Sequence, residues 1–203
     1  MKHAIKLFIM ITFFSKLFGC TTDNKNKKQE TQTKEISTKK TISIDEINKA
    51  NDEDLLYLIF DIIAEKLPYT ENEEEEYVAL RKLNKEQQAF YLVWCLEGEV
   101  NNGGYNQFYY NSTGKYFELL PDALELIGAT KHSELMRRAN KIFIIENKKI
   151  TQEQDGTLEG FSKSYEDNPL DIFDQEFADL EEIENLEELQ IKLVRKNKEK
   201  FIN

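Results

Sequence analysis

The stretch EGEVNNGGYNQFYYNSTGKYFE, residues 97–118, is the most unusual part of the chain. Its two adjacent glycines, Gly103 and Gly104, stand among amide side chains, and six aromatic residues follow between Tyr105 and Phe117. Glycine commonly ends helices and adopts a positive φ at little cost. The pattern therefore predicts that a helix stops at the two glycines and that the chain turns a sharp corner there.

The corner has two interpretations. In the structural one, the aromatic side chains fill the core, and Asn101, Asn102, Gln107 and Asn111 satisfy backbone groups exposed at the turn. In the functional one, tyrosines and amides point outward and line a groove, as they do in many recognition surfaces. The residue types favour the structural interpretation, and both stay open. The candidate site comprises Glu99, Asn101, Asn102, Gly103, Gly104, Tyr105, Gln107, Phe108, Asn111 and Gly114.

Apolar residues spaced three and four apart predict helices on both sides of this corner. Ser43 and Glu46 have the spacing of a capping box, so we expect the folded part to begin there. Runs of alternating polar and apolar residues, which would indicate strands, are not evident. The prediction is an all-α domain of about six to eight helices over residues 42–203. Helices are expected at about 52–67, 84–102, 105–110, 116–127, 133–145, 169–180 and 185–201, with a polar loop at 151–168.

Residues 1–19 have the organisation of a lipoprotein signal peptide. Lys2 and Lys6 precede the apolar segment Leu7–Phe14, which is too short to span a bilayer as a mature helix. The segment Leu17–Cys20 resembles the lipobox of bacterial lipoproteins, and this resemblance implies cleavage before Cys20 and lipidation of its sulfur. We therefore expect a lipid anchor at the bacterial cell envelope, with the outer membrane slightly favoured. An ordinary signal peptide or a short membrane anchor is the alternative.

Charge is distributed unevenly along the chain. The net charge is −11, from 38 acids and 27 lysines and arginines. Residues 1–40 hold nine of those bases and three of the acids, which leaves 18 bases, 35 acids and a net charge of −17 for residues 41–203. Residues 20–41 follow the signal peptide as a polar segment and predict a flexible linker. The field of the acidic domain would repel nucleic acid and attract a basic protein.

Catalytic chemistry has little support in the sequence. Beyond the signal peptide the chain has one thiol besides Cys20, Cys95, and one histidine, His132, and nothing near them in the sequence pairs the two. Motifs for phosphate or dinucleotide binding are not evident. Glu97 and Glu99 could form an acid–base pair, with Glu99 the better candidate, but with so many acids such proximity arises by chance. We predict that the protein is not an enzyme and that it uses no metal and no cofactor.

Residues 171–191 contain nine acids and no base, and basic residues follow them. Helix-dipole complementarity explains acids at the start of the last helix and bases at its end. It explains less well the acids that belong to a separate, earlier helix. These form a candidate acidic surface for a basic partner, with ordinary solvated surface as the alternative: Asp171, Asp174, Glu176, Asp179, Glu181 and Glu182.

The segment EVNNGGYNQFYYNSTG at residues 99–114, followed by ALELIGA at residues 123–129, resembles the signature of a bacterial all-helical family whose named member is a DNA-mimic protein. The resemblance covers about residues 50–203. It implies a small acidic α-protein, and the DNA mimic itself displays carboxylates in place of phosphates to DNA-binding proteins. The motif here is nearly uncharged, so it cannot be the phosphate mimic, and it defines either the shared fold or a shared function that mimicry does not describe.

These observations favour a membrane-anchored, extracytoplasmic domain that binds a basic protein. An inhibitor or immunity-type lipoprotein, acting on a toxin with a cationic cleft, is the most concrete form of this hypothesis. The first alternative is an envelope enzyme or small-ligand binder that uses the Asn101–Asn111 corner. The second is a DNA mimic that sequesters a DNA-binding protein, which requires the chain to stay in the cytoplasm.

Overall fold

The computed structural model describes residues 41–68, 70, 72–153 and 155–202. The predicted signal peptide at residues 1–19, the lipidated Cys20 and all but the last residue of the 20–41 linker lie outside these residues. The described residues belong to one compact unit that is bounded by Lys39 and Asn203.

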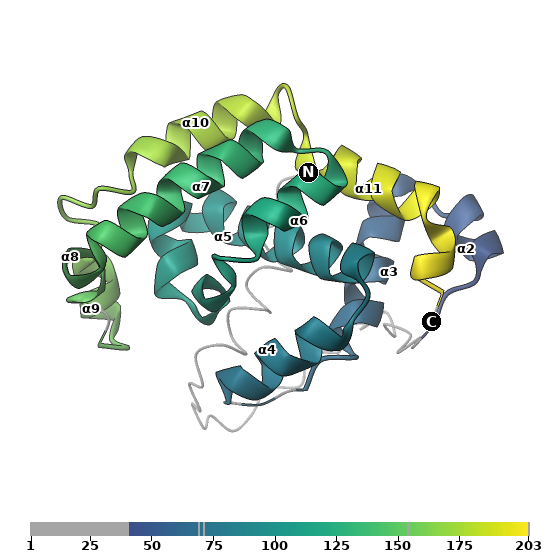
Figure 1. Ribbon diagram of the computed structural model, residues 1–203, viewed down its shortest axis with the longest axis horizontal. Coiled ribbons are helices and arrows are strands. Elements are labelled where there is room, and N and C mark those ends of the chain that lie inside the picture. The colour runs from purple at the N-terminus through teal and green to yellow at the C-terminus, as the bar shows by residue number, and fades with distance from the viewer. Residues whose placement is uncertain (1–40, 69, 71, 154, 203) are drawn as a thin grey trace, which may run out of the picture. The chain divides into compact units, whose positions relative to one another are not determined.

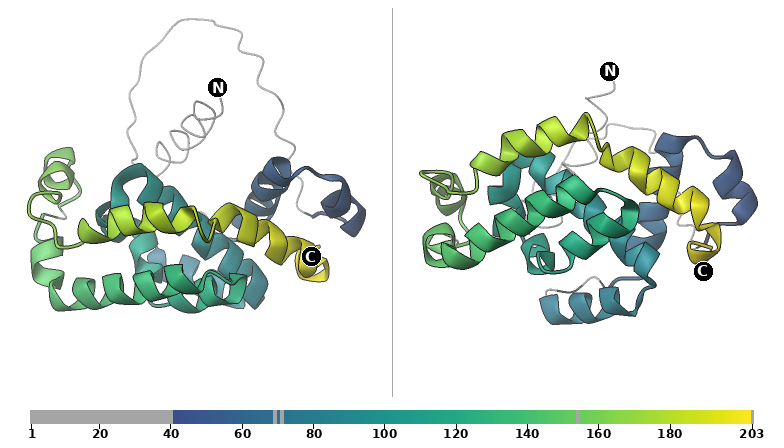
Figure 2. Two further views of the ribbon diagram at one scale, coloured as in Figure 1. Left: turned by 90° about the horizontal axis from the view of Figure 1, so that it is seen from above. Right: turned by 45° about the horizontal axis from the view of Figure 1, so that its top comes forward.

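Helices make up all the regular secondary structure of the described residues, which contain no strand, so the all-α prediction is confirmed (Figures 1 and 2). There are ten α-helices and two 3-10 helices in this part of the chain. In chain order they are α2 (Ile44–Lys49), α3 (Asp52–Ala64), α4 (Glu73–Lys82), α5 (Lys85–Tyr110), η1 (Ser112–Tyr116), α6 (Leu120–Ile127), α7 (Thr130–Ile145), α8 (Asn147–Thr151), α9 (Leu158–Lys163), α10 (Ile172–Glu181), α11 (Leu186–Lys196) and η2 (Lys198–Lys200).

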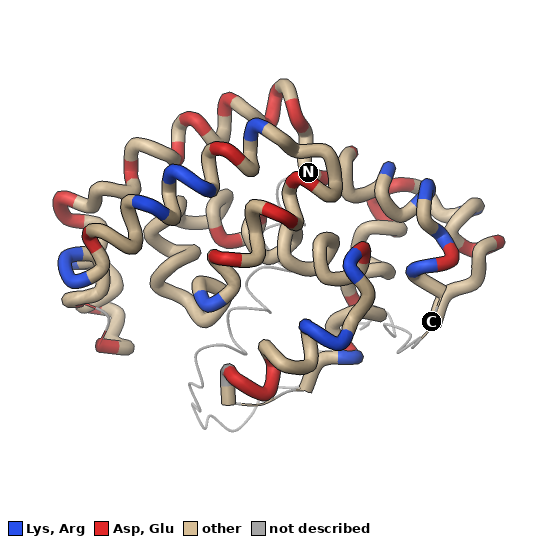
Figure 3. Tube along the Cα trace, in the orientation of Figure 1, with Lys and Arg blue, Asp and Glu red and all other residues tan. Residues whose placement is uncertain are grey.

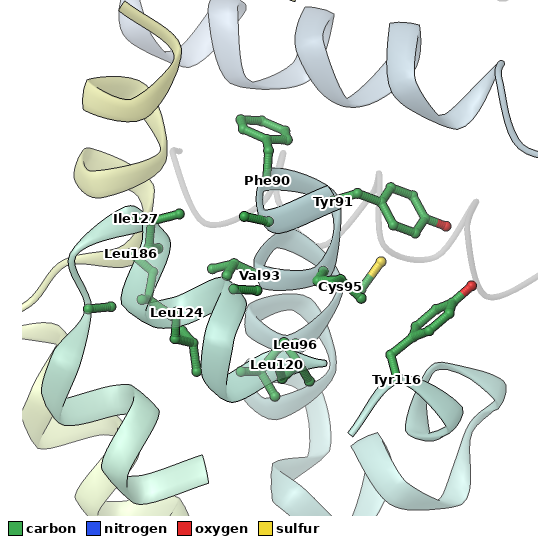
Figure 4. Packing of buried hydrophobic residues seen from close by; sticks show 14 of the residues in the cluster. Phe90, Tyr91, Val93, Cys95, Leu96, Tyr116, Leu120, Leu124, Ile127 and Leu186 are labelled. Atoms are coloured by element: carbon green, nitrogen blue, oxygen red, sulfur yellow. The ribbon is translucent and has the colours of Figure 1, made fainter. Parts of the chain in front are cut away.

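Helix α5 is the centre of the fold, because it contacts α3, α6, α10, α11 and η1. Its N-cap is Asn84, whose side chain accepts the N–H of Gln87 at 2.9 Å and donates to the carbonyl of Lys200 at 2.7 Å. The predicted helix start is thus confirmed. Figure 4 shows how its buried face packs, with Leu96 of α5 close to Leu120 of α6.

Helices α6 and α7 form a hairpin beside α5 (Figure 1). Pro121 lies in the first turn of α6, where its missing N–H costs no hydrogen bond, so it marks a fresh helix start. Gly128 ends α6 in the left-handed region with φ 96°, as the sequence predicts. Helix α7 then runs along α10, which the chain reaches only after α8 and α9.

The first and last α-helices of the described chain are joined directly. Ser43 and Glu46 form the predicted capping box at the start of α2. Arg195 of α11 donates to the backbone carbonyl of Ile47 at 2.8 Å and to that of Ala50 at 3.0 Å. These bonds satisfy carbonyls at the C-terminal end of α2, which would otherwise lack partners. The short helix α2 is therefore stabilised by its bonds to the C-terminal region and not by its own backbone hydrogen bonds alone.

Helix α4 is joined to the fold by a buried leucine, Leu80, and by the carboxylate of Glu76. Glu76 is the last glutamate of the acidic run at the start of α4 and is only partly exposed. Its carboxylate accepts from Lys115 Nζ at 2.6 Å and from the Tyr116 hydroxyl at 2.7 Å. The Tyr77 ring also stacks on Tyr116, with centroids 6.2 Å apart. Glu76 thus connects α4 to η1.

The polar segment 151–168, predicted to be a loop, contains α9 and the last residue of α8. Thr157 caps α9 by accepting the N–H of Gly160 at 2.9 Å. Phe161 packs edge-to-face on Tyr110 of α5, with ring centroids 4.9 Å apart. The side-chain cap and the aromatic contact with a distant residue both stabilise a short helix where composition alone indicates a loop.

Among the helices of the described residues, none is both long enough and apolar enough to span a bilayer.

Candidate functional site

The corner in α5 is formed by the two glycines, as predicted. Gly104 has φ 70° and ψ −174°, a combination that in proteins is almost restricted to glycine, whereas Gly103 has φ −157°, so only one of the two needs the positive φ. Asp174 of α10 accepts the N–H of Tyr105 at 2.8 Å and thereby caps the second half of α5. The Tyr165 hydroxyl donates to the carbonyl of Gly103 at 2.9 Å.

Below the corner lies a buried carboxylate, Glu99, which is 5% exposed. It accepts from Gln107 Nε2 at 2.6 Å, from Asn111 Nδ2 at 2.8 Å and from the Thr113 hydroxyl at 3.3 Å. Burial raises the pKa of Glu99, and these three donors oppose the rise. Asn102 adds a further bond, from its Nδ2 to the Gln107 amide oxygen at 2.7 Å. The network ties both halves of α5 to η1.

The amides therefore act differently from the structural expectation, which assigned them to exposed backbone groups. Asn102, Gln107 and Asn111 bond to Glu99 or to one another, and Asp174 supplies the backbone cap instead. Asn101 is exposed. Sequence reasoning also missed Asn106, a buried residue that donates to the Ser164 hydroxyl at 2.8 Å. Glu99 and Gln107 are eight residues apart in the sequence, and that spacing does not by itself predict a hydrogen-bond network.

Most of the aromatic residues of the corner are buried, as the structural interpretation expects. Tyr105, Phe108, Tyr109 and Tyr116 all belong to the core. Gly114 is also enclosed, because a Cβ at this position would lie 2.9 Å from the Tyr109 carbonyl oxygen. These aromatic side chains therefore contribute to the core, as the structural interpretation expects.

The partly exposed aromatics border an open groove of about 310 Å³ at the end of α5. We call this the aromatic groove. The Tyr109 and Phe143 rings stack with centroids 4.2 Å apart, and Phe143 meets Phe117 edge-to-face at 5.5 Å. The groove borders the end of the predicted corner, and its lining includes Tyr109, Tyr110, Asn111, Lys115, Phe117 and Phe143.

The six acids predicted as a surface lie on α10 and the turns at its ends, and we call them the α10 ridge (Figure 3). Asp171, Asp179 and Glu182 are exposed. The other three have roles within the fold. Asp174 caps α5, and burial raises its pKa against the lowering effect of the Tyr105 N–H. Glu176 forms an ion pair with Arg138 of α7. Glu181 lies beside His132, with its Oε1 3.5 Å from Nε2.

Glu184, in the turn after α10, caps α7. Its carboxylate accepts the N–H of Lys131 at 2.9 Å and that of His132 at 3.2 Å. It also accepts from the Thr130 hydroxyl at 3.3 Å. A carboxylate at a helix N-terminus meets unpaired N–H groups and the positive end of the helix dipole. Part of the acidic C-terminal segment therefore holds the fold together.

The remaining candidates for catalysis are not brought together. The Cys95 side chain is buried near Tyr91 and Tyr116, and burial raises the pKa of its thiol (Figure 4). His132 instead contacts Phe177 and Glu184. Glu97 is buried and accepts from Gln190 Nε2 at 3.4 Å. Within the described residues, no group of three or more His, Cys, Asp or Glu side chains is placed to hold a metal ion.

Fold and charge together define the class as a small, acidic, all-helical domain. The family model described as DMP19-like protein matches residues 81–197, more than half of the chain, and the chain therefore belongs to this family. The match includes the corner motif and residues 123–129, so the family predicted from these motifs is confirmed. No curated protein and no solved structure shows significant similarity to the sequence.

Proposed function

We propose that this DMP19-like domain binds a basic protein through the α10 ridge, in the way that a DNA mimic presents carboxylates to a DNA-binding protein. The observation that carries the proposal is charge. Residues 41–203 have a net charge of −17, and the nine acids of residues 171–191 have no base among them. Such a field attracts cationic partners and speeds their association.

The spacing of these acids supports the same function. A helical rise of 1.5 Å per residue places Asp171 and Glu182 about 16 Å apart along α10. One DNA strand carries about five phosphates over that length, and the three exposed carboxylates of the ridge are spread along it. Asp171, Asp179 and Glu182 are the exposed members and would make the first contacts.

The proposal also includes where the protein is located in the cell and how it acts. Lipidation at Cys20 would hold the domain at the cell envelope, and outside the cytoplasm the partner would be a basic envelope protein or an incoming toxin. The protein would then act as an inhibitor or immunity-type lipoprotein, and it would bind without catalysing a reaction. The engagement of Glu99 by three donors supports this, because such a carboxylate is committed to the fold.

The test is capture of a partner by the full-length protein from envelope extracts and neighbouring-strain lysates, at about 50 mM and about 500 mM salt. We expect a basic protein to bind at low salt and to be released at high salt. A variant with Asp171→Asn, Asp179→Asn and Glu182→Gln should lose most of this binding. The matched control changes three exposed acids elsewhere: Glu53→Gln, Glu65→Gln and Glu199→Gln.

Two outcomes would contradict the proposal: binding that is insensitive to salt, and equal loss of binding in both triple variants. A further arm separates the two kinds of basic partner. If duplex DNA displaces the captured protein, the partner is a DNA-binding protein and literal mimicry applies. If DNA has no effect, the ridge recognises a basic surface that does not bind DNA.

A further inference from the structure

The aromatic groove lies where two helices end. Tyr109 and Tyr110 are the last two residues of α5, and Phe143 is in the last turn of α7. Neither helix has a basic residue in its last turn. The C-terminus of a helix carries partial negative charge from carbonyls without intrahelical partners, and a cation nearby is favourable. The described chain leaves both of these helix ends without a basic residue of their own.

The one cation that lines the groove is already neutralised. Lys115 Nζ lies 2.6 Å from the Glu76 carboxylate, and the Lys115 side chain is only 14% exposed. Glu118 follows Phe117, and Glu146 is the residue after α7, and both are exposed. Lys148 and Lys149 are exposed on α8. Because the lysine that lines the groove is already paired with Glu76, the lining would not repel a positive group from outside.

The side chains that line the groove favour a positive group of planar shape. Phe143, Phe117 and Tyr110 are partly exposed aromatic side chains around the opening. Aromatic faces attract cations, and the flat, weakly hydrated guanidinium of arginine stacks on them better than an ammonium does. Asn111 uses one Nδ2 hydrogen to donate to Glu99, and its Oδ1 is an acceptor available to a ligand. An acceptor beside aromatic faces suits a donor-rich, planar cation.

We propose that the aromatic groove receives an arginine side chain from the basic protein partner. This inference rests on the proposed function and adds a specific contact to it. The α10 ridge would attract the partner by charge, and the groove would distinguish an arginine at its surface from a lysine.

The test compares two peptides of equal charge, hexa-arginine and hexa-lysine, by calorimetric titration of the full-length protein in detergent. We expect hexa-arginine to bind about threefold to tenfold more tightly, as one cation–π contact allows. Phe143→Leu keeps an apolar side chain but removes the ring, so it should abolish the preference for arginine and leave the affinity for hexa-lysine unchanged. Tyr110→Leu is the second groove variant, for use if Phe143→Leu lowers the unfolding temperature.

The ridge variant with Asp171→Asn, Asp179→Asn and Glu182→Gln is the control. It should weaken both peptides equally and keep the preference for arginine. Equal affinities in the unmodified protein, or a preference that survives both groove variants, would overturn the inference while the proposed function stands. If neither peptide binds in a salt-dependent way, the electrostatic basis of the proposed function fails as well.

Discussion

The carboxylate of Asp174 occupies the space beside Gly104 into which the Cβ of any other residue would project. The same carboxylate accepts the N–H of Tyr105 through Oδ1 at 2.8 Å. Gly104 is therefore needed for two reasons, its positive φ and the close approach of α10. Two segments that are 70 residues apart in the sequence are joined at this one point.

The first prediction concerns this close approach. Gly104→Ala should lower the free energy of unfolding by about 3 kcal/mol or more, because it adds a steric overlap to a backbone conformation that already costs about 1–3 kcal/mol without glycine. The measurement is chemical denaturation monitored by circular dichroism. Gly156→Ala is the control, since Gly156 also has a positive φ, 78°, but nothing lies within 4 Å of its Cβ position. Equal losses in the two variants would show that Asp174 does not restrict Gly104.

The second prediction concerns the buried carboxylate. Glu99→Ala leaves the Gln107 and Asn111 amides without their acceptor and should cost about 2–4 kcal/mol of stability, since each unsatisfied buried donor costs about 1–3 kcal/mol. Glu99→Gln keeps one oxygen for both amides and should cost about 1 kcal/mol or less. Thermal and chemical denaturation measure both. If Glu99→Gln leaves stability unchanged but removes binding of the partner, the corner takes part in recognition as well as in folding.

The pH dependence of Glu99 has a definite sign. Because its pKa is higher in the folded protein than the ordinary value of 4.5, the folded state keeps a proton that the unfolded state has lost. Its contribution to stability therefore decreases as pH rises from about 4.5 through the folded pKa. Glu99→Gln should remove this slope from a plot of stability against pH. A slope that persists in the variant would assign it to another group.

The third prediction concerns the cap of α7. Glu184→Ala should destabilise the protein by about 1–2 kcal/mol, because the N–H groups of Lys131 and His132 lose their acceptor. Glu182→Ala, a nearby and exposed acid, should change stability by less than about 0.5 kcal/mol. Denaturation midpoints compare the two. If Glu182→Ala costs as much as Glu184→Ala, the acidic segment contributes through its overall charge and not through this cap.

Features that depend on neighbours in the sequence could be predicted. The break at Gly103–Gly104, the capping box at Ser43 and the end of α6 at Gly128 all follow from local backbone chemistry. The apolar spacing likewise fixed the class as all-α. The partners of the polar side chains could not be predicted, because each bond joins residues that only the fold brings together. Glu76 with Tyr116, 40 residues later, is one such pair.

The candidate site likewise has a part that could be predicted from the sequence and a part that could not. Sequence reasoning found the corner residues and the ridge acids, but it could not separate the acids that face solvent from those that cap helices. Asp179 and Asp174 lie five residues apart on α10, and one is exposed while the other caps α5. Helix periodicity shows that they lie on different faces. Only the position of α5 shows which face is inside.

The last prediction uses His132, which lies between α7 and the end of α10. Its ring is 1% exposed, packs edge-to-face on Phe177 and has its Nε2 3.2 Å from the Glu184 carbonyl. Burial lowers its pKa below the ordinary 6.5, although the neighbouring Glu184 acts in the opposite direction. The neutral ring is thus the form that the fold prefers.

The sign of this effect is opposite to that of Glu99. Below about pH 6.5 the unfolded chain takes up a proton on His132 that the folded protein does not accept until the pH reaches its lower pKa. The His132 contribution to stability is therefore complete above pH 6.5 and is lost as the pH falls through the folded pKa. Melting temperatures measured between about pH 5 and pH 8 should fall toward acid pH in the unmodified protein. In His132→Gln, which cannot titrate, that part of the fall should vanish, and an unchanged profile would mean that Glu181 and Glu184 compensate fully for the burial of the ring.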